Sequence, residues 1–177
     1  MPEGPECRRI ALQLSEEVSS KKLVDISVET GRYTKKPLPG MSDILADAPL
    51  TIHGAGVHGK FIFFLLDKQW SLWNTLGMTG GWSRTPTKHT RVILHLSDGP
   101  ICFNDMRNFG TLKFVKGRQP IADKLNSLGP DLLAEECDDE VFAQCIRRKS
   151  NKTIVEALMD QSVVSGVGNY VKAEALY

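Results

Sequence analysis

Residues 91–115 read RVILHLSDGPICFNDMRNFGTLKFV and contain three short runs rich in β-branched and aromatic side chains. The runs are 91–96, 101–104 and 111–115, and turn-forming residues separate them at 97–100 and 105–110. Glycine, proline, aspartate and asparagine between such runs are typical of turns that join neighbouring strands. This stretch therefore predicts part of a β-sheet.

The same pattern extends toward the N-terminus. Four further candidate strands lie at 23–30, 50–57, 61–66 and 70–74. Seven short strands at this spacing are typical of a β-sandwich or a barrel, and the residues alone do not choose between the two.

Helical patterns flank the strands on both sides. Pro5 suits the first turn of a helix, and the apolar residues after it share one helical face, which predicts a helix over roughly 5–20. After Gly117 the periodicity becomes helical again, at about 119–127, 138–148, 152–160 and 169–177. The stretch LGPDLL, residues 128–133, then reads as the link between a β domain and a helical domain.

Composition narrows the class of protein. The chain has 177 residues, is 41% hydrophobic and carries a formal net charge of +1. It has no apolar run near the ~20 residues of a membrane helix, and its opening MPEGPECRR lacks the apolar stretch of a secretory signal. We therefore expect an intracellular protein that does not enter a membrane. The four cysteines and four histidines show no zinc-ligand spacing, so we predict no metal site.

Charge placement says more about partners than the total does. Acidic residues cluster at 135–140, and the chain then becomes basic at Arg147, Arg148, Lys149 and Lys152. Such a cluster is more often a solvated face than a phosphate site. If it contacts a nucleic-acid backbone, binding will weaken steeply with added salt.

The extreme N-terminus carries the most distinctive chemistry. Removal of Met1 would expose the secondary amine of Pro2, with Glu3 beside it. An amine attacks a carbonyl-like carbon to give a Schiff base, and a neighbouring carboxyl group can move protons to and from the sugar or the leaving group. Taken alone, these two residues are also compatible with a common second residue and an ordinary helix N-terminal charge.

Four other stretches hold candidate binding residues. In VHGKFIFF, Lys60 heads a strand and can hold a phosphate as a point charge, and in NTLGMTG, Met78 lies between glycines where an apolar side chain can wedge between bases. In NDMRNFGTLKF, Arg107 and Phe109 can fill the space left by an extruded nucleotide. In MDQSVVSGVGNYVKAEALY, two glycines bracket a turn and Asn169 starts a helix, so amide donors can face a phosphate.

These five stretches, in this order and at these intervals, resemble the formamidopyrimidine-DNA glycosylase and endonuclease VIII family. The resemblance runs from Met1 to Tyr177. Its most specific parts are MPEGPE and DQSVVSGVGNYVKAEALY, the latter similar to the family's helix-two-turn-helix motif. The base preference stays open, because the gap-filling set resembles the formamidopyrimidine branch whereas RNFGT looks nearer the endonuclease VIII-like branch, including viral and eukaryotic-type members.

The resemblance implies an α+β fold in three segments. Residues 1–117 would form an N-terminal helix and a two-layer antiparallel β-sandwich, residues 118–133 a linker, and residues 134–177 a partial helix-two-turn-helix domain. Family members continue into further helices and a zinc or zincless finger, so we expect a chain truncated after this motif. Val155 stands where many relatives carry a lysine, which weakens any claim to their purine preference.

The resemblance also implies an activity, a base excision repair glycosylase and abasic-site lyase for oxidised bases. It would act as a monomer on damaged double-stranded DNA, without a cofactor, and would cleave the strand by β,δ-elimination. Pro2 would be the nucleophile and Glu3 the general acid, with Glu6 and Glu174 as supporting residues. Phosphates would be held by Lys60 and Asn169, and the gap left by the flipped base would be filled by Met78, Arg107 and Phe109.

Two other functions remain open from the sequence. The chain is a damage-binding module without turnover if the missing finger or a retained Met1 abolishes catalysis, because a retained Met1 turns the Pro2 nitrogen into an amide. A small N-terminal-proline tautomerase would share only the amine nucleophile, and it has no use for the helix-two-turn-helix motif.

Overall fold

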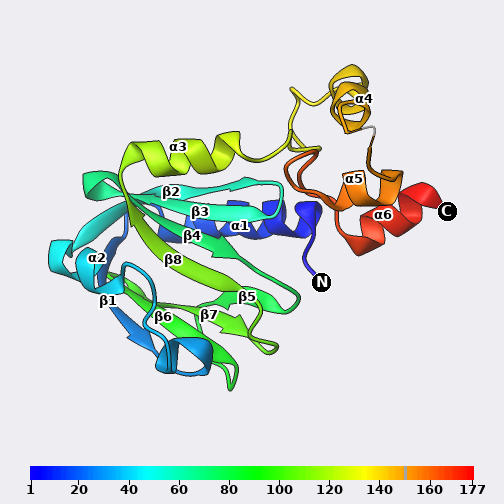
Figure 1. Cartoon of the computed structure of the whole chain (residues 1–177). Helices are drawn as coiled ribbons and strands as arrows, with labels where there is room; N and C mark the ends of the chain where they lie inside the picture. Colours follow the sequence, from blue (N-terminus) through cyan, green and yellow to red (C-terminus); the bar gives the residue numbers. More distant parts are fainter. Residues whose placement is uncertain (150) are drawn as a thin grey trace.

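Eight strands and the long helix before them make up the larger part of the molecule (Figure 1). The computed structural model describes residues 1–149 and 151–177. The strands are β1 (Lys22–Val28), β2 (Leu50–His58), β3 (Phe61–Leu66), β4 (Trp70–Thr75), β5 (Gly80–Ser83), β6 (Thr90–Leu96), β7 (Gly99–Asp105) and β8 (Thr111–Lys116). The helices are α1 (Gly4–Val18), α2 (Met41–Asp47), α3 (Arg118–Asn126), α4 (Asp139–Arg147), α5 (Ile154–Met159) and α6 (Asn169–Leu176), with short 3-10 helices η1 (Gly31–Thr34) and η2 (Asp67–Gln69).

The strands follow one antiparallel order, β5-β7-β6-β1-β2-β3-β4-β8. At its middle, β1 pairs with β2 only through Lys22 with Thr51 and Leu23 with Leu50. The sheet folds over at this short junction, so four strands on each side face one another as two layers (Figure 1). The expected α+β fold with a β-sandwich is confirmed.

The core lies between the two layers and continues onto α1. The Trp82 ring lies 5.4 Å from that of Phe64 and 5.3 Å from that of Phe103, and its Nε1 donates to Asn74 Oδ1 at 3.0 Å. Helix α1 adds its buried face to this core, namely Cys7, Ala11, Leu14 and Val18. The predicted helical face is therefore correct, and the helix ends two residues early because Ser20 takes a left-handed conformation with φ of 64°.

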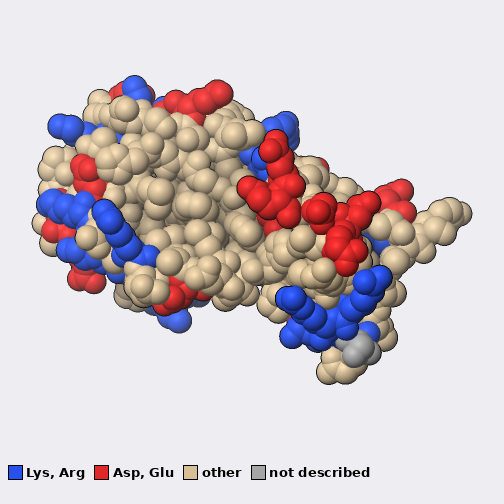
Figure 2. All heavy atoms as spheres, turned by 90° about the horizontal axis from the view of Figure 1, so that it is seen from above, with Lys and Arg blue, Asp and Glu red and all other residues tan. Residues whose placement is uncertain are grey.

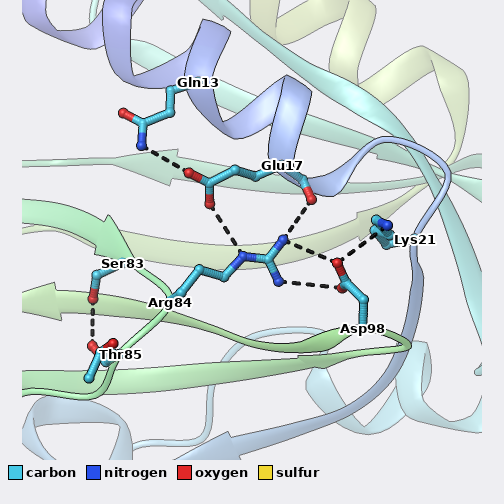
Figure 3. Close-up of polar contacts among 7 residues, drawn as sticks. All are labelled: Gln13, Glu17, Lys21, Ser83, Arg84, Thr85 and Asp98. Atoms are coloured by element: carbon cyan, nitrogen blue, oxygen red, sulfur yellow. Dashed lines mark hydrogen bonds and ion pairs between the residues drawn. The ribbon is translucent and has the colours of Figure 1, made fainter.

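Arg84 connects the end of α1 to the opposite layer (Figure 3). Its guanidinium donates to the backbone oxygen of Glu17 at 2.8 Å and lies 3.4 Å from the Glu17 carboxylate. On its other side it pairs with Asp98, in the turn between β6 and β7, and Lys21 reaches the same carboxylate at 3.3 Å. This network fixes the C-terminal turn of α1, whose N-terminal turn carries the site described below.

The outer edge of β8 is covered by the segment that follows β1. The Tyr33 hydroxyl accepts a hydrogen bond from Leu112 N at 2.7 Å and donates to Leu112 O at 3.1 Å. Two residues further along, Phe114 N donates to Pro39 O at 2.9 Å. A side chain and a loop carbonyl thus satisfy backbone groups that a neighbouring strand would otherwise pair with.

Helices α4, α5 and α6 build a second, smaller core, which includes the buried Leu158, Val163, Val164 and Val167. All four helices predicted after Gly117 are present, within two residues at their starts. Strand β5 and helix α2 were not predicted. Within residues 1–149 and 151–177, the helices are all too short or too polar to cross a membrane.

Candidate active site

The first and last helices of the chain meet at Glu3, which is completely buried. Glu3 is the N-cap of α1, and its two carboxylate oxygens accept hydrogen bonds from the first turn of α6. Tyr170 N donates at 2.9 Å and Val171 N at 3.2 Å. Free N–H groups and a positive dipole end are what a helix N-terminus offers to an anion. The helix therefore holds this carboxylate in one orientation.

Four glycines make the close approach possible. Gly4 N donates to Gly166 O at 2.8 Å, so the α1 backbone itself touches the turn before α6. Gly59, in the β2–β3 turn, has φ of +57°, and a Cβ there would lie 2.6 Å from Gly166 N. A Cβ on Gly168 would lie 2.4 Å from the Glu3 carboxylate. The junction between sandwich and helices thus requires residues without side chains.

Lys60 reaches across the same junction. Its Nζ donates to Val167 O at 2.7 Å, and Gln161 donates to the same oxygen at 3.0 Å while accepting from Gly166 N at 3.0 Å. Burial lowers the pKa of the Lys60 ammonium, and the negative charge of Glu3 opposes that shift. Lys60 is therefore a half-buried cation beside the turn that starts α6.

Pro2 and Lys60 line a pocket of about 410 Å³ between the sandwich and the helical part. Met1 lines the same pocket and is half exposed. Cys7 also lines the pocket, but burial raises the pKa of its thiol to about 12. This thiol therefore stays protonated and is a poor nucleophile.

Glu6 completes the contact between the two helices. Its carboxylate accepts from Glu3 N at 2.9 Å and from the Tyr170 hydroxyl at 2.9 Å. The backbone N–H of Glu3 and the Tyr170 hydroxyl lower the pKa of Glu6, so this side chain is ionised near neutral pH. Glu6 thus orients the backbone at Glu3 and anchors α6.

Met78, Arg107 and Phe109 lie on two turns that touch one another. Met78 lines the pocket and is 37% exposed, and Phe109 is 55% exposed with the Arg107 guanidinium 5.2 Å from its ring centre. The buried carboxylate of Asp105 joins the turns, because it accepts from Thr79 Oγ1 on one turn and from Gly110 N, at 2.7 Å, on the other. The Asp105 carboxylate therefore holds together the two turns that carry these three exposed side chains.

Basic side chains of the helical part gather at one end of that part, apart from a group of acidic side chains (Figure 2). Arg147, Arg148 and Lys149 are exposed near the end of α4. Lys152 instead pairs with Asp160, and this contact lowers the pKa of the aspartate below its usual range. Lys152 therefore forms an ion pair within the protein, whereas the side chains of the other three cations are exposed to solvent.

Two family models match this chain. The formamidopyrimidine-DNA glycosylase N-terminal domain matches residues 1–112, and the formamidopyrimidine-DNA glycosylase H2TH domain matches residues 128–177. The chain belongs to the formamidopyrimidine-DNA glycosylase family. The resemblance inferred from the five motifs is thereby confirmed.

Individual members of the formamidopyrimidine-DNA glycosylase family agree with this assignment. The enzyme of Desulfitobacterium hafniense (strain DSM 10664 / DCB-2) is 33% identical, and that of Oceanobacillus iheyensis is 34% identical; the alignments cover 100% of this chain and 66% and 65% of those proteins. The chain thus spans about two thirds of the length of the curated relatives it matches.

Solved structures of formamidopyrimidine-DNA glycosylases superpose closely on the chain. MutM (Fpg) from Thermus thermophilus gives a TM-score of 0.81 at 30% identity, over 99% of this chain and 63% of that one. The Lactococcus lactis enzyme, solved in non-covalent complex with DNA containing an AP site, gives a TM-score of 0.83 at 25% identity, over 99% and 68%.

The fold brings together most of the residues singled out from the sequence. Pro2, Glu3, Glu6 and Lys60 converge at the α1–α6 junction, and Met78 lines the same pocket as Pro2 and Lys60. Asn169 is the first residue of α6, as expected, and its exposed side chain accepts from Lys172 Nζ at 3.3 Å. Glu174 is exposed on α6 and, among the described residues, makes no side-chain hydrogen bond or ion pair, so its supporting role stays a prediction.

Sequence reasoning missed three residues that hold this site. Asp131 accepts hydrogen bonds from Gly59 N at 2.9 Å and from Leu133 N at 3.0 Å. These bonds connect the β2–β3 turn to the segment before α4. Gln161 braces the turn before α6, and Asp105 braces the two exposed turns. Gln161 and Asp105 belong to the quoted motifs, but only their contacts in the folded chain distinguish them from ordinary polar residues.

Proposed function

We propose that this chain is the catalytic part of a bifunctional DNA glycosylase, which excises oxidised bases from double-stranded DNA during base excision repair and then cleaves the strand. The observation that carries this proposal is the pocket that both Pro2 and Lys60 line, with buried Glu3 fixed by the N-terminus of α6. Family membership supports the same reaction class.

The first step requires removal of Met1, because only a free amine carries the lone pair that attacks. The Pro2 nitrogen bonds to C1′ of the extruded nucleotide while the Glu3 carboxyl protonates the sugar ring oxygen, so the bond from C1′ to that oxygen breaks and the ring opens. The lone pair of the nitrogen then expels the damaged base, which takes up the proton that the amine has lost, and a cationic iminium remains. The backbone donors of Tyr170 and Val171 keep that carboxyl pointed at the α1–α6 junction.

The strand is cut by the same iminium. Its positive charge acidifies C2′, and loss of that proton expels the phosphate on the 3′ side. A second elimination expels the phosphate on the 5′ side. The chain's own contribution is to hold and orient the DNA, with phosphates at Lys60 and Asn169 and the three exposed side chains of the braced turns in the gap left by the base.

Borohydride trapping tests the nucleophile directly. Hydride reduces an iminium to a stable amine, so protein with a free Pro2 amine should become covalently attached to a duplex that carries an abasic site. The Met1-retaining protein is a matched control, because it differs only in turning that amine into an amide. A Pro2→Gly variant, which keeps a weaker primary amine, should give less adduct.

The outcome separates two functions. An adduct that disappears when Met1 is retained establishes the amine lyase. Absence of an adduct from protein with a free Pro2 amine, together with tight binding to the abasic duplex, would make the chain a damage-binding module without turnover.

A further inference from the structure

A second pocket, of about 510 Å³, adjoins the first. One wall is the outward face of β3, β4 and β8, where Phe61, Trp73 and Lys113 lie, and the facing wall is the segment that runs from Arg32 to Pro39. The two pockets share Phe61, Thr75 and Lys124 as lining residues. A strand that leaves the proposed active site on this side therefore enters the second pocket next.

The charge of this pocket is wholly positive. Arg32, Lys36, Lys113 and Lys124 line it, and none of its lining residues is acidic. Over residues 1–149 and 151–177, none of these four cations forms an ion pair. By contrast, Lys116, three residues after Lys113 on the same strand, pairs with Asp47 at 2.7 Å. The pocket thus concentrates uncompensated positive charge.

Aromatic rings lie beside three of these four cations without neutralising them. Lys113 Nζ lies 4.1 Å from the centre of the Trp73 ring, and Lys124 Nζ lies 5.4 Å from that of Phe61. The Arg32 guanidinium lies 6.0 Å from the centre of the Tyr33 ring. A ring face attracts a cation through its quadrupole but carries no net charge, so an anion can still bind to each cation.

The volume of the second pocket and the chemistry of its lining residues indicate what it binds. Basic groups combined with aromatic and apolar surface are typical of proteins that bind unpaired nucleic-acid strands. A pocket of this size accepts nucleotide-sized groups, roughly 300–1,000 Å³, but not a duplex. We propose that it binds the phosphates of an unpaired DNA strand, such as the end that cleavage at the neighbouring site releases. The inference rests on the proposed function for the source of that strand.

The test measures binding of a short, lesion-free, single-stranded DNA oligonucleotide by fluorescence anisotropy across a range of salt concentrations. The test variant is the double substitution Lys36→Gln with Lys113→Gln, which leaves the shared Lys124 in place. Its matched control is Lys68→Gln with Lys116→Gln, which removes two lysine charges that contact Asp47 outside the pocket. Thermal unfolding of each variant verifies the fold.

The expected effect follows from counterion release. Each phosphate contact to a single strand contributes about 0.7 to the slope of log K against log salt, or about fivefold in affinity at 0.1 M salt. The pocket variant should therefore lose about 1.4 from the slope and about 25-fold in affinity at 0.1 M salt. The control variant should bind as the unmodified protein does.

Two results would overturn the inference: unchanged binding by the pocket variant, or an equal loss in the control variant, which would show general charge attraction. Neither depends on the amine, because the oligonucleotide carries no lesion. If the pocket variant and the control variant bind the single strand equally well, while the unmodified protein still traps an abasic duplex, only the inference about this pocket is refuted. Normal strand binding by a protein that never traps an abasic duplex refutes the proposed function alone.

Discussion

Glu3 is at once a helix cap, a buried carboxyl group and the proposed acid of the reaction. Its exposed fraction is zero, and both of its oxygens accept backbone hydrogen bonds from a helix that lies more than 160 residues away in sequence. The sequence motif identified the residue, since MPEGPE is distinctive. It did not reveal the partners, because backbone N–H groups at the start of α6 have no side-chain signature.

Substitution of Glu3→Gln separates its roles. Loss of a positioned acid should slow release of a damaged base by about 10²–10⁴-fold. The amide NH2 would also face a backbone N–H, which should lower the free energy of unfolding by about 1–3 kcal/mol. Single-turnover base release and thermal unfolding measure the two effects. Glu16→Gln, an exposed change on the same helix, is the control, and equal base release by both variants would refute the role.

At the scale of elements, the Arg84 network joins α1 to the β6–β7 turn (Figure 3). Arg84→Gln removes a charged donor from the carbonyl at the end of α1 and breaks two ion pairs. Because the side chain is partly exposed, we expect a loss of about 1–2 kcal/mol in the free energy of unfolding, measured by urea denaturation. Lys88→Gln, at an exposed position, should change it by less than about 0.5 kcal/mol.

Asp47 links α2 to two strands and makes stability depend on pH. Lys116 and the Trp70 Nε1–H lower the pKa of its carboxyl from 3.8 to about 2. A depressed pKa stabilises the fold fully above the unfolded value of 3.8, and the contribution disappears as the pH falls toward 2.

The corresponding test compares the unmodified protein with an Asp47→Asn variant. The variant should be less stable at neutral pH, and the difference in melting temperature should shrink between pH 4 and pH 2. A difference that stays constant across this window would show that Asp47 acts through packing instead.

The elements that the sequence missed have plain physical causes. Strand β5 reads GGWS, and two glycines without side chains give no alternating pattern. Trp82 nevertheless holds it in place by packing between Phe64 and Phe103. Helix α2 follows the stretch KKPLPG, whose prolines and glycine predict a loop, and it buries Ile44 as its one fully enclosed side chain. Tertiary packing decides both.

At the scale of the whole molecule, the helical part docks on the sandwich through backbone contacts at Gly59. Gly59→Ala adds a Cβ 2.6 Å from Gly166 N at a residue with φ of +57°. We expect a loss of about 1–3 kcal/mol in stability and a slower trapping rate, because the Glu3 and Lys60 contacts cross the same junction. Gly81→Ala is the control, since its Cβ would meet nothing within 4 Å. Trapping at the control rate would contradict this account.

Contacts between segments that are distant in the sequence could not be predicted from local sequence patterns. Local patterns gave seven of the strands, the helices after Gly117 and the motifs of the site. They did not give Asp131, whose carboxylate reaches Gly59 across 72 positions of the chain. Its neighbours in LGPDLL look like an ordinary link, and only the folded chain reveals the hydrogen bond.

The contact between α1 and α6 also determines when the site can assemble during protein synthesis. The proposed nucleophile, Pro2, is synthesised long before Tyr170 and Val171, whose backbone groups fix Glu3. Trimming of Met1 can therefore precede assembly of the site by most of the translation time. In the proposed mechanism, a nascent chain that has lost Met1 would carry a free amine without its positioned acid, and base excision would begin only once the α6 segment has been made.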